Sequence, residues 1–385
     1  MQKNSLLIIN AGSSSIKFSI FAADGNSLLY KGNIDGILQA PIFTVFNDKM
    51  IEIYKKTSFA IGHDNALGEL CRWLNINDNI RIKAIGHRIV HGGRDFSAPV
   101  IINNKIILKL KKLIPFAPLH QGHNILAMEV LKEIYPKIPQ IACFDTSFHN
   151  TMPDINRLFA IPEVYSKDGL QRYGFHGLSY EYICSVLPRY FKPFAKSNVI
   201  IAHLGNGASM CAVKNGRSIA TTMGFTPLDG LVMGTRCGSI DPGIILYLMR
   251  EKGMSEQEIS DLLYKESGLK ALSGVSYDMR LLLKDKDKKA KFAVDYFCMQ
   301  AARQLSGLIP TLGELHAIVF TAGIGESSAI IRDKICLNLR WLGVRINAKS
   351  NKDNLVKISN KDSKIPVYVI PTNEDLVIVR YVWIL

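Results

Sequence analysis

The 385-residue sequence has no long apolar run and no regular cysteine pattern. No apolar run reaches the roughly 18 residues needed to span a bilayer. Residues 6–9 are too few for the apolar core of a signal peptide, so we expect a cytoplasmic protein with no membrane partner. The seven cysteines include no Cys-x-x-Cys pair, which argues against a disulfide framework or a zinc site. We expect reduced thiols, and the neighbouring Arg236 allows a lowered pKa at Cys237.

The sequence also lacks a basic stretch interleaved with aromatic residues, although its net charge is +14. The densest lysine run, residues 284–291, alternates with Asp285 and Asp287 and is typical of a solvated surface. A nucleic-acid groove is therefore not expected. The excess positive charge fits an acidic small substrate only weakly, and scattered surface lysines are the preferred explanation. The 48% hydrophobic and 21% charged composition is that of a globular protein, and the length predicts two domains.

One pattern of strands occurs twice, about half the chain apart. Residues 6–9 form a buried apolar run, residues 10–15 a small polar loop, and residues 16–21 an alternating strand. Asp24-Gly25 is a hairpin signal before a third strand at 27–34. The second copy has the same order of features: strand 199–202, glycine loop 205–209, strand 210–213, turn Asn215-Gly216 and return strand 217–223.

This repetition predicts two domains with a common opening, although hairpins are common enough for chance similarity to remain an alternative. Helical periodicity over 124–135 and 290–308, between strands, indicates an α/β fold. We place the boundary between residues 146 and 155. The predicted domains are 1–148 and 149–374, with 375–385 packing back on the first. Ligands of such folds bind beyond the carboxyl ends of strands, here in the cleft between the domains.

Three glycine-bearing segments can approach phosphates closely: 10–15, 205–207 and the strand-to-glycine segment 317–327. The first is not a Walker A loop, because it lacks Gly-Lys-Ser/Thr and precedes a strand. Each loop alone is as readily a tight turn. Three in one chain, two of them related by the repeat, favour a nucleotide site.

Charged residues follow predicted strands at Arg88, Asp145 and Glu374. Arg236 follows the apolar segment 231–234, and His176 lies before a helix. Phosphoryl transfer requires alignment, Mg²⁺ and positive charge on the transferred oxygens. A carboxylic acid is already ionised at pH 7 and needs no base, so an arginine-rich site suits a carboxylate acceptor. Asp145 as the base for a sugar hydroxyl remains an alternative at this point. For His87, His91 and His203, a core or loop position is the preferred interpretation.

At these residues the sequence resembles the acetate kinase family, within the actin-like, sugar-kinase and Hsp70-type ATPase fold. The resemblance runs in order over almost the whole chain. Its motifs are Asn10-Ala-Gly-Ser-Ser-Ser15, His87-Arg-Ile-Val-His-Gly-Gly93, Ala117-Pro-Leu-His120, Phe144-Asp-Thr146, Arg172-Tyr-Gly-Phe-His-Gly177, His203-Leu-Gly-Asn-Gly207, Met233-Gly-Thr-Arg236, Phe320-Thr-Ala-Gly-Ile-Gly-Glu326 and Pro371-Thr-Asn-Glu374.

The resemblance implies two ribonuclease H-like domains and reversible in-line transfer of the γ-phosphoryl group of ATP to acetate, with Mg²⁺ (Mn²⁺ as an alternative). It implies catalytic roles for Arg88, Asp145, His176 and Arg236, with help from His120, and a homodimer formed through the second domain. The acyl group would contact Arg88, Val90, Leu119, Phe175 and Pro227. Asn10 and Glu374 would place the metal. The nucleotide would contact Ser15, Lys17, His203, Asn206, Gly207, Asp278, Met279, Arg280, Gly323, Ile324, Gly325 and Ser327.

The sequence departs from the family pattern at Gln121-Gly122-His123, at Ser327 and at Cys237-Gly238-Ser239, without losing a proposed catalytic group. Two alternatives to an acetate kinase remain. One is a kinase for propionate or another short acid. The other is a non-catalytic, actin-like nucleotide-binding module, because a fold alone does not fix function.

Overall fold

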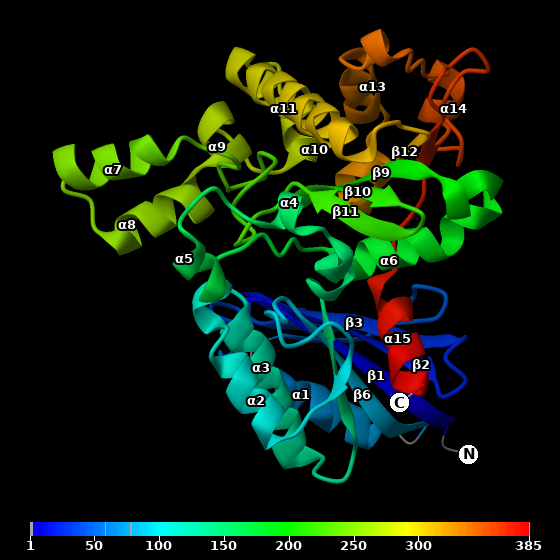
Figure 1. The fold of residues 1–385 in the computed structure, drawn as a ribbon. Coiled ribbons are helices and arrows are strands. Elements are labelled where there is room, and N and C mark those ends of the chain that lie inside the picture. The colour runs from blue at the N-terminus through cyan, green and yellow to red at the C-terminus, as the bar shows by residue number, and fades with distance from the viewer. Residues whose placement is uncertain (1–2, 58, 78, 385) are drawn as a thin grey trace. The chain divides into compact units, whose positions relative to one another are not determined.

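The computed structural model describes residues 3–57, 59–77 and 79–384, and the chain forms two compact units. Unit 1 comprises residues up to Ser147 and the C-terminal segment from Asn373, whereas unit 2 runs from Phe148 to Thr372. Each unit contains one β-sheet with helices packed on it (Figure 1). The predicted α/β class is confirmed.

Unit 1 has an eight-stranded sheet in the order β5-β4-β3-β2-β1-β6-β8-β7. Its strands are β1 (Lys3–Ala11), β2 (Ser15–Ala22), β3 (Leu28–Asp35), β4 (Ile42–Asn47), β5 (Glu52–Thr57), β6 (Ile80–Ile89), β7 (Val100–Ile101) and β8 (Gln140–Phe144). Its helices are α1 (His63–Ile76), α2 (Asn104–Lys111), α3 (Gln121–Ile134) and α15 (Glu374–Ile384).

The central strands of unit 1 are buried on both faces, which explains their continuous apolar runs. Leu7 and Ile9 belong to a core cluster with residues of α1 and α3. On the opposite face, a Cβ atom added at Gly86 would lie within 3 Å of Ile378 and Val382 of α15. The glycine therefore allows the C-terminal helix to pack directly on β6.

Unit 2 has a five-stranded sheet in the order β11-β10-β9-β12-β13. Its strands are β9 (Asn198–Leu204), β10 (Ala208–Lys214), β11 (Arg217–Thr221), β12 (Ala317–Thr321) and β13 (Val367–Val369). Its helices are α4 (Asp154–Arg157), α5 (Glu163–Lys167), α6 (Gly177–Val186), α7 (Pro242–Glu251), α8 (Glu256–Asp261), α9 (Gly268–Ser273), α10 (Met279–Leu282), α11 (Lys288–Leu312), α12 (Ala322–Ser327), α13 (Ala329–Leu337) and α14 (Ala348–Lys352).

The two sheets share one plan, which confirms the predicted repeat. In unit 1 the strands β3-β2-β1-β6-β8 follow the same order as β11-β10-β9-β12-β13 in unit 2. In both, the first three strands in sequence are antiparallel and the last two are parallel to the first. The Asp24-Gly25 and Asn215-Gly216 turns connect equivalent antiparallel strands, with Gly25 and Gly216 both at positive φ.

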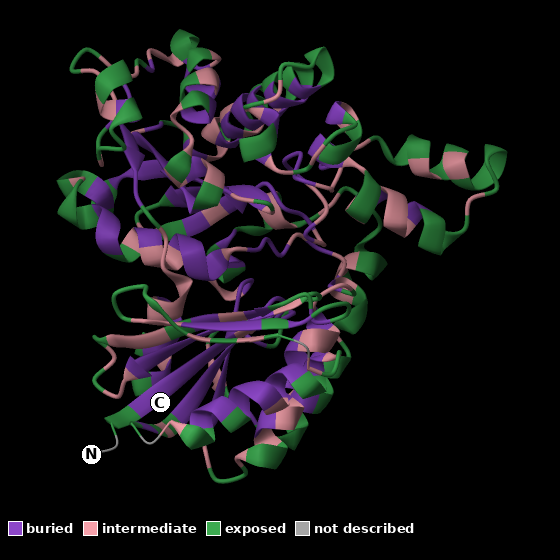
Figure 2. Cartoon of the chain, turned by 180° about the vertical axis from the view of Figure 1, so that it is seen from behind, coloured by how far each residue is buried: buried purple, intermediate pink, exposed green. Residues whose placement is uncertain are grey.

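Burial is concentrated in the strands and in the helix faces that cover them (Figure 2). In unit 2, α6 and α11 lie on opposite faces of the sheet (Figure 1). All seven cysteines are free thiols. Within residues 3–57, 59–77 and 79–384, no helix has the length and hydropathy required to cross a bilayer.

Candidate active site

The predicted polar residues of unit 1 lie where three neighbouring parallel strands end. Asn10 is near the end of β1, Arg88 near the end of β6, and Asp145 directly follows β8. Because parallel strands end at the same edge of a sheet, these side chains are brought together there. Glu374, at the start of α15, joins them from the C-terminal segment.

Arg88 is the centre of this group. Its Nε and Nη2 atoms donate to the two carboxylate oxygens of Asp145 at 3.0 and 2.5 Å. Its Nη1 donates to Oδ1 of Asn10 at 3.3 Å, and its Nε lies 3.4 Å from a carboxylate oxygen of Glu374. Such a two-point contact with Asp145 fixes the plane of the guanidinium group.

Burial alone would lower the pKa of Arg88, but Asp145 and then Glu374 more than offset this and raise it. The Asp145 side chain is only 1% exposed, so it cannot reach a solvent-borne substrate in this arrangement. The geometry therefore suits Asp145 as the residue that orients Arg88, and speaks against its alternative as a base for a hydroxyl.

The loop after β1 is a tight turn in which the N–H of Gly12 donates to the carbonyl of Ser15 at 2.8 Å. Ser13 and Ser14 are exposed on it. Lys17 lies opposite Asn10 in the β1–β2 register. A side chain from α1 supports the loop, because Nε2 of His63 is 2.8 Å from the carbonyl oxygen of Gly12.

The predicted acyl-contact residues of unit 1 lie in adjacent segments. Val90 is buried and directly follows β6, while Leu119 is half-buried and His120 precedes the first residue of α3. The preferred core interpretation of His87 and His91 is confirmed. Both are fully buried, and burial lowers the pKa of His87 to about 4 and that of His91 to about 3.

In unit 2, the predicted residues His176, Gly207 and Arg236 lie together. A Cβ atom at Gly207 would lie 3.5 Å from Nε2 of His176 and 3.8 Å from Nη1 of Arg236. Two nitrogen-bearing side chains thus face the same point of the backbone. An added Cβ would already be in van der Waals contact with both, so a larger side chain at residue 207 would fill the space between them.

A short chain of contacts fixes the orientation of His176. Its Nδ1 is 2.7 Å from the hydroxyl of Ser209, and its ring is stacked on His203 at a centroid distance of 4.1 Å. The Nδ1 of His203 is in turn 2.8 Å from the hydroxyl of Ser179. His176 adopts a left-handed conformation (φ 60°) immediately before α6, so backbone and side-chain contacts together direct Nε2 toward Gly207.

Arg236 has a different environment from Arg88. Its Nη1 donates to the carbonyl of Pro227 at 2.9 Å and to the sulfur of Met233 at 3.6 Å, both of which are neutral. Burial lowers its pKa. Pro227 and Phe175, the predicted acyl contacts of this unit, are buried. The prediction of a lowered pKa at the adjacent Cys237 is wrong, because burial raises the pKa of this thiol to about 11.

The third glycine segment is not the loop that we expected. Gly323-Ile324-Gly325 lies inside the short helix α12, whose first residue, Ala322, has a φ of 64°. The carboxylate of Glu326 accepts from the N–H groups of Ala322 at 2.7 Å and Thr372 at 2.9 Å. This tertiary contact stabilises the sharp strand-to-helix turn.

Gly323 still offers an open approach, since it is exposed and no atom would lie within 4 Å of an added Cβ. Ser327 is also exposed. The preceding loop at 205–207 is a tight turn in which the N–H of Gly205 donates to the carbonyl of Gly207 at 3.1 Å. The two segments are neighbours, because an added Cβ at Gly205 would lie 3.8 Å from Cβ of Ala322.

The predicted adenosine contacts Asp278, Met279 and Arg280 lie at the start of α10. Asp278 precedes the first residue of α10 and forms a 2.6 Å ion pair with Arg280, whose side chain is 87% exposed. Met279 is buried. The N–H of Gly234 donates to the carbonyl of Asn206 at 3.2 Å, which ties the segment before Arg236 to the glycine loop.

The predicted residues therefore divide between the two units. Unit 1 contains Asn10, Ser15, Lys17, Arg88, Val90, Leu119, His120, Asp145 and Glu374. Unit 2 contains Phe175, His176, His203, Asn206, Gly207, Pro227, Arg236, Asp278, Met279, Arg280, Gly323, Ile324, Gly325 and Ser327.

Sequence reasoning missed the buried residues that hold these segments. In unit 2, Ser209 and Ser179 orient two histidines. Arg332 is fully buried and donates to the carbonyls of Gly325 and Glu326 at 2.9 and 2.8 Å. An arginine close after a glycine motif was the available signal. In unit 1, Asn124 was assigned only to a helix.

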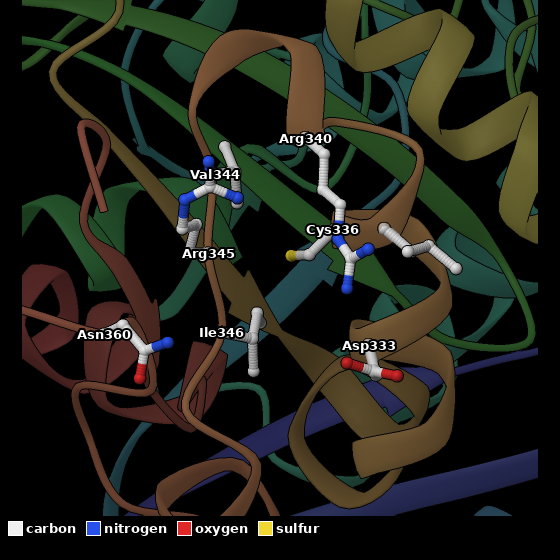
Figure 3. Close-up of a pocket in the computed structure, with 8 residues that line it drawn as sticks. Asp333, Cys336, Arg340, Val344, Arg345, Ile346 and Asn360 are labelled. Atoms are coloured by element: carbon white, nitrogen blue, oxygen red, sulfur yellow. The ribbon is translucent and has the colours of Figure 1, made fainter. Parts of the chain in front are cut away.

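A small pocket of about 140 Å³ in unit 2 contains none of the predicted residues (Figure 3). It lies beside α13 and the segment that follows it, and Asp333, Arg340, Arg345 and Asn360 contribute polar groups to it. Arg340 and Arg345 are both exposed. It therefore does not form part of the site.

Comparison with known proteins identifies the family. A model of the acetokinase family matches residues 5–380. The chain is 46% identical to the acetate kinase of Rhodopseudomonas palustris over 98% of this chain and 97% of that protein, and 43% identical to that of Rickettsia typhi over 99% of both. Among solved structures, a propionate kinase from Francisella tularensis has a TM-score of 0.93 at 38% identity, and the acetate kinase of Porphyromonas gingivalis 0.88 at 31%, each covering 98% of both chains. The chain belongs to the acetokinase family.

Proposed function

We propose that the chain transfers the γ-phosphoryl group of ATP to acetate, reversibly, and forms acetyl phosphate and ADP by direct in-line displacement. The observation that carries the proposal is the near full-length match to relatives named acetate kinase. The chain also contains Arg88 at a strand end, and His176 and Arg236 beside a glycine turn, which the reaction would use.

The acceptor carboxylate is ionised at neutral pH, so no side chain has to remove a proton from it. What opposes the reaction is the repulsion between this anion and the γ-phosphate. Arginines offset that repulsion and stabilise the charge on the transferred oxygens. In this proposal Arg88 binds the acceptor and phosphoryl oxygens, and Arg236 and Nε2 of His176 bind the transferring group. Asp145 orients Arg88, and His120 assists.

The oxygen-bearing side chains near Arg88 are of the kind that binds Mg²⁺ when the ion arrives together with the nucleotide. Asn10 and Glu374 present an amide oxygen and a carboxylate, both directed at Arg88. Mg²⁺ is commonly held by one or two protein oxygens together with substrate phosphates and waters, so no protein cage is needed. When bound, the ion would neutralise charge on the β- and γ-phosphates. We propose Asn10 and Glu374 as its protein ligands, with Mn²⁺ as a substitute.

We place the nucleotide on unit 2. The exposed Gly323, the 205–207 turn and the segment 278–280 offer backbone groups and the Asp278–Arg280 pair, and His203 supports His176. Ser15 and Lys17, on the β1–β2 hairpin of unit 1, are proposed phosphate contacts. The direct test is release of ADP and formation of acetyl phosphate, with and without Mg²⁺.

Arginine 236 provides the sharpest test of these roles. Arg236→Ala removes a charge of the kind worth on the order of 10³ or more in rate. Near-normal turnover of the purified, folded variant would show that the assignment of Arg236 is wrong. Nucleotide-dependent sedimentation without any acyl phosphate would instead favour the non-catalytic module.

A preference for propionate is the second candidate, since one similar structure is of a propionate kinase. One methylene in an apolar pocket changes binding by only about 1–3 kcal/mol. Val90 at the proposed acyl pocket favours the shorter acid. Comparison of kcat/KM for acetate, propionate and butyrate decides, and a clear preference for propionate would overturn the choice of acetate.

We further propose a homodimer formed through unit 2. Helix α7 has no buried residue. Four large apolar side chains on it are 44–53% exposed, namely Ile244, Leu246, Tyr247 and Met249. Exposed apolar faces of this kind are usually covered by a partner. Leu246→Asp should convert a dimer to a monomer in sedimentation, whereas the control Leu108→Asp, on α2 of unit 1, should not.

We also propose a cytoplasmic location without nucleic-acid or membrane partners, which fractionation and binding assays would test.

A further inference from the structure

We propose that Asn124 is a positioning residue that holds the ends of β1 and β6 at a fixed separation and thereby aligns the 10–15 loop with Val90. Its kinetic consequences rest on the proposed function. None of the family motifs quoted above includes Asn124, and the motif nearest to it ends at His120.

The need for such a residue arises from the sheet itself. The parallel β1–β6 ladder ends at the pair Ile9↔His87. Beyond it, β1 remains paired with β2 up to Ala11↔Ile16, and β6 remains paired with β8 up to Ile89↔Phe144. The two central strands therefore continue without backbone pairing to each other at the point where Asn10 and Arg88 lie.

Asn124 bridges this opening. It lies in the first turn of α3 and is 2% exposed. Its Oδ1 accepts from the N–H of Val90 at 3.0 Å, and its Nδ2 donates to the carbonyl of Ala11 at 2.7 Å. A side-chain amide carries the same donor and acceptor as a peptide group, so this one side chain substitutes for the missing rung of the ladder.

Gln121, the first residue of α3 and three positions before Asn124, supports the same segment. It is fully buried, its Oε1 accepts from the N–H of His91 at 3.2 Å, and its Nε2 donates to the carbonyl of His91 at 3.0 Å. The start of α3 therefore fixes Val90 and His91 on one strand. Unlike Gln121, Asn124 also bonds to the other strand, at Ala11.

Asn124 could in principle serve only to give two buried backbone groups a hydrogen-bond partner. The location of its two bonds indicates a positioning role instead. Ala11 directly follows the proposed metal ligand Asn10, and Val90 is a proposed acyl contact two residues from Arg88. Reacting groups tolerate little displacement, and about 1 Å of misplacement can cost about 10²-fold in rate. Loss of the bridge should therefore change both metal–nucleotide use and acid preference.

Two variants separate the halves of the bridge. Asn124→Asp keeps an acceptor for the N–H of Val90 but places an oxygen opposite the carbonyl of Ala11, whereas Asn124→Leu loses both bonds. We expect the leucine variant to lose about 10- to 100-fold in kcat/KM for acetate and to lose much of its acetate-over-propionate preference. The aspartate variant should keep that preference and raise the KM for MgATP.

A matched control is Asn198→Leu. Asn198 is 9% exposed at the start of β9 in unit 2, and its Nδ2 donates to the carbonyl of Leu312 at 3.1 Å. This variant should lower the melting temperature without changing either KM or the acid preference. If Asn124→Leu does not fold, Asn124→Ala removes the same two bonds without added bulk.

Amide hydrogen exchange, read at Val90, gives a test that does not depend on turnover. Exchange there should be at least tenfold faster in Asn124→Leu and near wild type in Asn124→Asp. Unchanged exchange in the leucine variant, or unchanged kinetic constants despite faster exchange, would overturn the proposal. If the wild-type chain phosphorylates no acid, the proposed function fails, and the exchange result alone decides whether Asn124 holds the strand ends.

Discussion

The contact between Arg88 and Asp145 can be perturbed by one isosteric change, Asp145→Asn. The carboxylate accepts two charge-assisted hydrogen bonds from Arg88, at 3.0 and 2.5 Å. An asparagine can accept only one of them and directs an N–H₂ group at the other guanidinium N–H. Because the side chain is 1% exposed, water cannot replace the lost partner.

The expected magnitude follows from these contacts. Breaking a buried ion pair by removing one charge costs about 3–5 kcal/mol. Glu374 remains 3.4 Å from Nε of Arg88 and compensates part of the loss, so we expect the lower end, about 3 kcal/mol of unfolding free energy. If a similar amount of alignment is lost in the transition state, turnover falls about 10²-fold, since each 1.36 kcal/mol is a factor of ten.

The assays are urea unfolding and acetyl phosphate formation on the same preparation. The matched control is Asp95→Asn, which removes a surface ion pair with Lys109 (2.7 Å) from a side chain that is 57% exposed. Such pairs contribute only about 0.2–1 kcal/mol, and activity should not change. Asp145→Asn with stability and turnover both close to wild type would refute the role of Asp145 in orienting Arg88.

Two further predictions concern stability. His87 and His149 are buried as neutral rings, with burial lowering the pKa of each to about 4, so the unfolding free energy should fall between about pH 6.5 and 4, by up to about 1.4 kcal/mol per pH unit for each histidine. His87→Gln should reduce the slope of unfolding free energy against pH by the contribution of one proton, as measured by urea unfolding at a series of pH values. An unfolding free energy that does not change with pH would contradict the burial of neutral histidines. Arg332→Met should cost about 1–3 kcal/mol for each carbonyl that loses its donor, measured by thermal unfolding, because the carbonyls of Gly325 and Glu326 both accept from Arg332, whereas Arg340→Met, at an exposed arginine, should change little.

Local signals in the sequence were sufficient to predict the strands that open each unit and their repetition. The apolar runs at 6–9 and 199–202 and the Asp-Gly and Asn-Gly turns specify each hairpin without reference to distant residues. The meeting of Arg88 and Asp145 also follows from sequence, because both residues come at or after the carboxyl ends of apolar, parallel strands.

What the sequence could not provide depends on contacts between distant segments. Asn124 bonds residues 34 and 113 positions away, and no local pattern encodes that pairing. The helical state of Gly323-Ile324-Gly325 depends on Glu326 meeting the N–H of Thr372, 46 positions on. The raised pKa of Cys237 reflects burial, which the adjacent arginine does not reveal.

The environments of the two arginines differ in a way that separates stability from function. Arg88 is paired with Asp145 and Glu374, whereas the hydrogen bonds that the described part of unit 2 gives Arg236 go to a carbonyl and a sulfur. A partly buried cation without a carboxylate partner is costly, and an arriving anion would supply the missing charge. Arg236→Met should therefore keep or raise the melting temperature while abolishing turnover, and should weaken stabilisation by ATP. Arg88→Met should instead lose about 3–5 kcal/mol, because it leaves buried Asp145 unpaired. Equal destabilisation by both changes would show that Arg236 is a structural residue and not a charge held for the phosphoryl group.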